Sequence, residues 1–205
     1  DWFTKNKQRY EEFVRIPALN FITRISHDLH TLSPHFMAVP KKVGGSLMRV
    51  YRDTRFSKDK TPYKTNIGIQ FRHELGKDVH APGYYVHIQS GECFLGAGIW
   101  HPDSPTLGEI RTTISKKQNQ WIALQKDKKF KSSFYLSGDS LKNPPRGYSA
   151  DHPLINDIKR KDFIAVKEIS HSEVLSADFH RKVLQNFKIT SEFMRFLCES
   201  LNVNF

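Results

Sequence analysis

The chain has 205 residues, of which 38% are hydrophobic and 26% charged, a composition typical of globular proteins rather than of disordered ones. A chain of this length can bury about 70% of the surface that its unfolded form exposes, so we predict one domain whose core needs neither metal nor disulfide. The net charge of +11 favours acidic partners, and no apolar run reaches the roughly 18 residues of a membrane span.

The first 32 residues carry the apolar spacing of two helices. Phe3 and Tyr10 belong to a stripe that recurs at three- and four-residue steps. Pro17 interrupts the stripe and fits the first turn of a second helix, because that position needs no backbone N–H. The chain begins at Asp1 inside this helical pattern and shows no signal peptide, so we expect the natural N-terminus to lie upstream.

Four strands are predicted in the next stretch, where apolar and polar residues alternate. They span residues 42–54, 66–72, 84–89 and 93–100. The Ser90-Gly91-Glu92 link is typical of a hairpin turn between the last two strands. Because successive strands have short links, we predict an antiparallel sheet.

A long helix is predicted from Ser104, which would be its N-cap, with Pro105 at the first helical position. Asp151 is predicted to cap a short helix near Leu154. Further elements are a strand at 133–136, a loop at 143–153, a strand at 166–169 and helices over 177–201 that restart at Thr190-Ser191. The predicted fold is therefore α+β: a mainly antiparallel sheet covered by long N-terminal, central and C-terminal helices.

Cys93 and Cys198 are the cysteines of the chain, and their spacing is not that of a metal site. We predict two buried, reduced thiols in a reducing, cytoplasmic compartment, with a structural disulfide as the alternative. His27, Asp28 and His30 resemble a metal-ligand run, but no third ligand shares the helical face of the histidines, so we predict no metal. The sequence also contains no phosphate-cradling glycine loop, and we predict no cofactor.

The segment 49–64 concentrates positive charge, with six basic residues against Asp53 and Asp59. Like charges repel, so this crowding indicates a place for an anion. Arginine suits that task because its planar fork binds phosphate or carboxylate through two parallel hydrogen bonds. In a regular strand Arg49, Asp53 and Arg55 would share one side, and Asp53 would orient a guanidinium. The predicted ligand-binding residues of the segment are Arg49, Arg52, Arg55, Lys60, Tyr63 and Lys64.

Further candidates lie outside this segment. Gly98 and its neighbour Gly96 bare one face of their strand, which permits close approach of a ligand or of a packed helix. His101 ends that strand and Arg111 follows in the next helix, whose first amides can bind an anion. The catalytic candidates are Asp53 and His87, since His87 lies on the polar face of its strand and its type suits a general base.

Several motifs along the chain occur together in one known family. They are Trp2-Phe3 with Tyr10, Arg49-x-x-Arg-Asp-x-Arg-Phe-Ser-x-Asp-Lys-x-Pro-Tyr-Lys64, Tyr84-Tyr85, Gly96-Ala-Gly98, His101-Pro102, Arg111, Pro144-Pro145-Arg-Gly147 and His152-Pro153. In these the chain resembles a conserved hypothetical family of bacteria and fungi, domain-of-unknown-function family 2461. The resemblance implies a single domain and no particular reaction. Because members usually start upstream of the Trp-Phe pair, it also implies an N-terminal truncation.

Three functional hypotheses follow. The first is an anion-binding domain, with a phosphorylated or carboxylated small molecule as ligand and the question of enzymatic activity open. The second is a nucleic-acid-binding protein, which the net charge and the lysines after Lys116 favour. The third is a structural or interaction module whose Arg–Asp pairs tie a loop to the sheet. None of the three involves a membrane.

Overall fold

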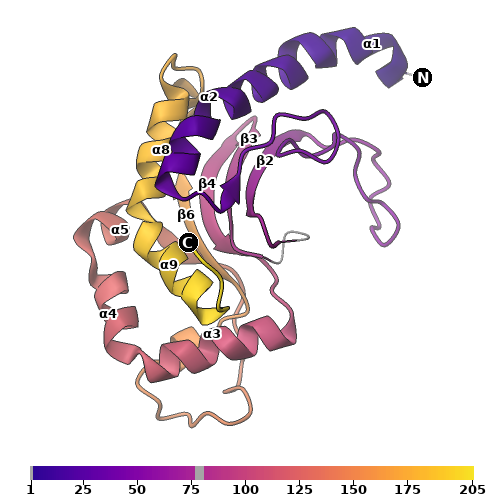
Figure 1. Cartoon of the computed structure of the whole chain (residues 1–205). Coiled ribbons are helices and arrows are strands. Elements are labelled where there is room, and N and C mark those ends of the chain that lie inside the picture. The colour runs from indigo at the N-terminus through magenta and orange to yellow at the C-terminus, as the bar shows by residue number, and fades with distance from the viewer. Residues whose placement is uncertain (1, 77–80) are drawn as a thin grey trace.

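The computed structural model describes residues 2–76 and 81–205. Its centre is a sheet in which the strand order is β1-β2-β3-β4-β6-β5 and every neighbouring pair is antiparallel (Figure 1). The strands are β1 (Phe36–Met37), β2 (Asn66–His73), β3 (Gly83–Gln89), β4 (Glu92–Ile99), β5 (Tyr135–Ser137) and β6 (Phe163–Glu168). The predicted α+β class is therefore confirmed.

The central strands form because their apolar residues alternate with polar or small ones. Phe71 of β2 lies opposite Tyr84 of β3, Val86 lies opposite Leu95 of β4, and all four side chains are buried. Such cross-strand pairs on one face are the unit of sheet stability. The predicted hairpin is confirmed as well: Gln89 pairs with Glu92, which leaves a two-residue turn with Gly91 at φ +82°.

The helices cover one face of this sheet and its lower end. In Figure 1, α2, α8 and α9 lie along one face, and α3, α4 and α5 wrap around the lower end. The bounds are α1 (Trp2–Tyr10), the π-helical turn η1 (Glu11–Arg15), α2 (Ile16–Leu32), α3 (Ser104–Lys116), α4 (Gln118–Lys126), α5 (Lys128–Ser133), α6 (Ile155–Ile158), α7 (His171–Val174), α8 (Phe179–Ile189) and α9 (Ser191–Ser200). Pro17 occupies the first turn of α2, as predicted. None of the described helices combines the length and the apolarity needed to cross a membrane.

The predicted strand at 42–54 is wrong. Residues 40–65 instead form an irregular excursion, here called the arm, which is tied to the sheet by the isolated pair Leu47–Ile69. Gly44 has φ +69°, and a Cβ on Gly45 would lie 2.5 Å from the Val39 carbonyl oxygen, so the chain folds back tightly at this point. The charged run that follows has no apolar face to bury, and no continuous ladder forms.

Two predicted caps are also corrected. Asp103, not Ser104, caps α3, because its side chain accepts the Thr106 N–H at 2.9 Å. Asp151 makes no cap of α6; instead, Nδ1 of His152 accepts the Leu154 N–H at 3.1 Å. The long central helix is divided into α3, α4 and α5, and the predicted break at Thr190 between the last two helices is confirmed.

We expect both cysteines of the folded protein to resist alkylation. Cys93 is 6% exposed and Cys198 1% exposed, neither is in a disulfide, and burial raises the pKa of the Cys198 thiol to about 12. Near pH 8 little thiolate is therefore available for attack. Mass spectrometry after iodoacetamide treatment should find the thiols unmodified in buffer and modified in urea. Equal labelling of Cys198 under both conditions would contradict the packing of α9.

Candidate functional site

The arm uses several of its charges internally. Arg52 forms an ion pair with Asp59, and Arg55 donates to Asp53 from Nε at 2.9 Å and from Nη2 at 2.7 Å. These hydrogen bonds lower the pKa of Asp53 to about 2, so its carboxylate is ionised and already engaged at neutral pH. Lys60 Nζ donates to the backbone oxygen of Thr54 at 2.8 Å. These contacts hold the arm in shape, which is a different arrangement from cations gathered around a ligand.

Tyr63 takes part in an aromatic cluster at the base of the arm. Its ring stacks on Phe3 of α1 with the centroids 4.7 Å apart, and Tyr51 lies 5.4 Å from Tyr63 and 5.8 Å from Phe3. Such ring contacts stabilise by about 0.5–1.5 kcal/mol each beyond the area they bury. The cluster therefore fixes α1 against the arm.

Arg49 and Lys64 are in a different position from the other cations of the arm. Lys64 is partly buried, and both its burial and the positive charge of Arg49 lower its pKa. Asp53 lies within electrostatic range of Arg49, but its carboxylate is bonded to Arg55. Among residues 2–76 and 81–205, no carboxylate lies at ion-pair distance from Arg49 or Lys64.

Lys64 adjoins a polar cluster on the sheet face opposite α2, α8 and α9. Its Nζ lies 4.0 Å from Sδ of Met48. A Cβ on Gly68 would lie 2.9 Å from that sulfur and 2.8 Å from the hydroxyl of Tyr85, so the two side chains meet above this glycine. The Tyr85 hydroxyl in turn lies 3.1 Å from Nδ1 of His87. The contacts from Lys64 to His87 are thus continuous across β2 and β3.

His87 has polar partners at both ring nitrogens. Nδ1 is within 3.4 Å of the Asn66 amide nitrogen as well as near Tyr85, and Nε2 lies 3.4 Å from Oε1 of Gln89. Since an amide N–H and a phenol can both donate to Nδ1, the proton is assigned to Nε2 and the imidazole is neutral. The ring also stacks on Phe94 at 4.6 Å and 9°. His87 therefore orients its neighbours and is poorly placed for the predicted role of general base.

Tyr85 and Asn66 were missed as candidate site residues in the sequence. Burial raises the pKa of Tyr85 to about 12, so its hydroxyl stays protonated and can donate a hydrogen bond. The available signal was the strand alternation, which places Asn66 on the same face as Gly68 and Tyr85 on the same face as His87.

The remaining candidates, Arg111 and His101, lie elsewhere. Arg111 donates from Nε to the Ile158 oxygen at 2.7 Å and from Nη2 to the Arg160 oxygen at 3.0 Å, which ties α3 to the end of α6. His101 follows β4 at the end of the sheet where Gly98 pairs with β3 and β6. The structure thus does not bring either residue to Lys64.

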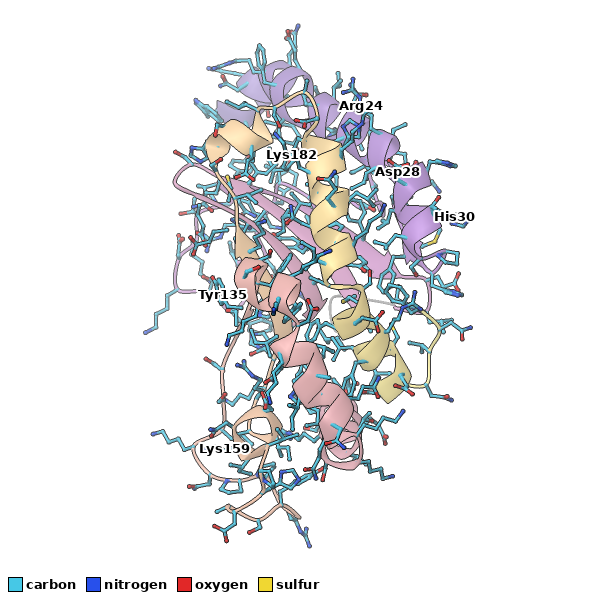
Figure 2. All side chains as sticks on the ribbon, turned by 90° about the vertical axis from the view of Figure 1, so that its left-hand side faces the viewer. Arg24, Asp28, His30, Tyr135, Lys159 and Lys182 are labelled. Atoms are coloured by element: carbon cyan, nitrogen blue, oxygen red, sulfur yellow. The ribbon has the colours of Figure 1, made fainter. Side chains whose placement is uncertain are left out.

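The histidine run on α2 does not form part of a cluster. Figure 2 shows Asp28 and His30 along the outside of this helix. In the described part of the chain, no group of three or more His, Cys, Asp or Glu side chains is arranged to hold a metal ion.

Comparison with protein families gives one result for nearly the whole chain. The family model described as "Conserved hypothetical protein (DUF2461)" matches residues 1–196 of the 205. Comparisons with curated proteins and with solved structures yield no match. The family predicted from the sequence motifs is confirmed, and its description assigns no activity. The protein with this sheet, arm and polar cluster belongs to the DUF2461 family of conserved hypothetical proteins.

Proposed function

We propose that this protein binds a small anionic ligand, phosphorylated or carboxylated, between Arg49 and Lys64. The observation that carries the proposal is the state of Lys64: its ammonium is partly buried and lies within range of a second cation, and both effects lower its pKa. Two like charges held together in a partly desolvated place cost free energy. A bound anion would remove that cost and favour the charged form of Lys64.

The side chains around Lys64 suit such a ligand. Arg49 would supply a planar fork of donors and Lys64 a compact charge, which are the two ways in which proteins bind phosphate and carboxylate groups. Tyr85 is a protonated donor near Lys64, and its hydroxyl is held by His87. We assign Arg52, Arg55 and Lys60 to the shape of the arm, as the third sequence hypothesis expected for its Arg–Asp pairs.

We expect Lys64→Met to weaken binding of pyrophosphate or citrate about 10- to 100-fold, the effect of losing a hydrogen bond to a charged group. In the wild-type protein, ligand at about 100 times its Kd should stabilise by about 2.7 kcal/mol. For a chain of this length that corresponds to a rise in Tm of roughly 5–10 °C. Without ligand, Lys64→Met should be no less stable than the wild type, because it removes a desolvated like-charge contact. Differential scanning fluorimetry and calorimetric titration measure both effects.

Lys58→Met is the matched control, because Lys58 is an exposed lysine of the same arm and the change removes the same charge. It should leave the Kd within about twofold, since exposed charges are screened by salt. Equal losses in both variants, with affinity for duplex DNA that falls steeply with salt, would favour the nucleic-acid hypothesis instead. No stabilisation of the wild type by millimolar anions would refute the proposal.

A further inference from the structure

A buried carboxylate, Asp162, fixes the turn that follows β4. Its side chain is 1% exposed, its Oδ1 accepts the backbone N–H of His101 at 2.8 Å and its Oδ2 accepts that of Asp139 at 3.0 Å. Gly138, with φ +105°, permits this approach, because a Cβ there would lie 2.4 Å from Cβ of Asp162. Both carboxylate oxygens are thus held by backbone donors from two separate segments.

The same carboxylate lies beside the imidazole of His101. Nδ1 of His101 is 3.1 Å from Oδ1 of Asp162. An ionised carboxylate can only accept, so a proton on Nδ1 is favoured and Nε2 carries the lone pair. The His101 side chain is 53% exposed, and within the described residues no hydrogen bond engages Nε2. An Asp-anchored ring with an open Nε2 is the arrangement found in general bases of the Ser-His-Asp type.

The backbone of His101 is also unusual. Its φ of +48° lies in the left-handed region, which is uncommon for residues other than glycine and asparagine. Such conformations persist where the surroundings enforce them, and they concentrate at functional sites. Here Asp162 engages both the N–H and the ring of His101. A tight turn alone would be served better by glycine, so the imidazole is retained at a cost.

An aromatic surface lies next to this imidazole. The Trp100 ring centroid is 4.4 Å from that of His101 at an interplanar angle of 34°, and Trp100 is 53% exposed. A half-exposed indole offers an apolar face against which a flat part of a ligand can pack.

The geometry points to a second site, in which Nε2 of His101 accepts the proton of a hydroxyl group, either of water or of a hydroxylated ligand packed against Trp100. The proton moves from the hydroxyl oxygen to Nε2, and the imidazolium that forms is stabilised by the carboxylate of Asp162. This site lies at the opposite end of the sheet from Lys64, because β2 begins with Asn66 opposite Gln89 while His101 follows the Gly83–Gly98 pair. It is therefore independent of the proposed anion site.

The tautomer of His101 gives the first test. In ¹⁵N-labelled full-length protein above the titration of the imidazole, we expect long-range ¹H–¹⁵N spectra to show the proton of His101 on Nδ1. Free histidine in water prefers the proton on Nε2, so this result would identify the hold of Asp162. A neutral ring protonated on Nε2 would overturn the proposal.

The second test is reactivity toward diethyl pyrocarbonate, which acylates unprotonated imidazole nitrogens, followed by peptide mapping. We expect His101 to react at least about tenfold faster than the exposed His30 of α2, and Asp162→Asn to remove the advantage. Asp139→Asn, an exposed neighbouring carboxylate, is the matched control and should leave the rate unchanged.

Two further outcomes decide the case. A His101 that reacts no faster than His30, or a folded Asp162→Asn protein with an unchanged rate, would overturn the proposal. If Asp162→Asn fails to fold, the tautomer and the comparison with His30 in the wild type decide it. His101→Asn should fold with an unchanged or higher Tm, since asparagine tolerates the left-handed conformation. A large loss of Tm in that variant would show that the ring serves the fold instead.

Discussion

Gly98→Ala is expected to unfold the protein or to lower its free energy of unfolding by more than about 4 kcal/mol. Gly98 has φ +136°, and a Cβ there would lie 1.9 Å from the carbonyl oxygen of Phe163. That oxygen belongs to the backbone of β6, which pairs with β4 through Gly98 and Ile164. Relief of the overlap would require separation of two central strands, because neither backbone has room to shift. Urea unfolding followed by circular dichroism measures the loss.

Gly108→Ala is the control for this substitution. Gly108 is exposed on α3, and no atom lies within 4 Å of the position that its Cβ would take. Alanine should stabilise the helix there by about 0.5–1 kcal/mol. A Gly98→Ala protein with wild-type stability would contradict the close approach of β4 and β6.

Trp121→Ala is expected to cost about 3–5 kcal/mol, the usual range for truncating a large buried aromatic side chain. Trp121 of α4 is 0% exposed. Its ring centroid lies 5.0 Å from that of Phe196, 6.0 Å from Phe163 and 6.2 Å from Phe193. The indole thus joins α4 to α9 and to the sheet, and its loss would leave a cavity between them.

Trp121→Phe separates the packing of the indole from its polar atom. Nε1 of Trp121 is buried and finds no hydrogen-bond partner in the described part of the chain. Phenylalanine removes this donor and most of the cavity cost, so we expect a loss below about 2 kcal/mol. Trp2→Ala, at a position that is 70% exposed, should change stability by less than about 0.5 kcal/mol. Equal losses for the two Trp121 variants would contradict a packing role.

The central strands could be predicted because each has one apolar face. In β2 the buried Ile69 and Phe71 alternate with partly buried polar residues, and this pattern specifies a strand without knowledge of its partner. The arm has β-type residues of the same kind, such as Val50 and Tyr51, yet it forms isolated pairs such as Tyr51–Tyr63 and no ladder. Whether such a segment joins a sheet depends on a partner strand, and local residue preference does not supply one.

The candidate site was predicted in part for a similar reason. The charge density of the arm located Arg49 and Lys64 but did not separate them from Arg52 and Arg55, whose carboxylate partners depend on how the arm turns. The contact between His101 and Asp162 joins residues 61 positions apart, so neither the spacing nor the periodicity of the sequence indicates it. Contacts of this kind follow from the completed sheet.

The N-terminal helix matters more than its exposure suggests. None of the residues of α1 is buried, yet Phe3 stacks on Tyr63, the residue directly before Lys64. A protein shortened past Phe3 would keep its core and its sheet, while Tyr51 and Tyr63 would lose a ring that shields them from water. The ammonium of Lys64 would then be carried by a looser backbone. Proteolytic trimming at this end could thus abolish ligand affinity without any measurable fall in thermal stability.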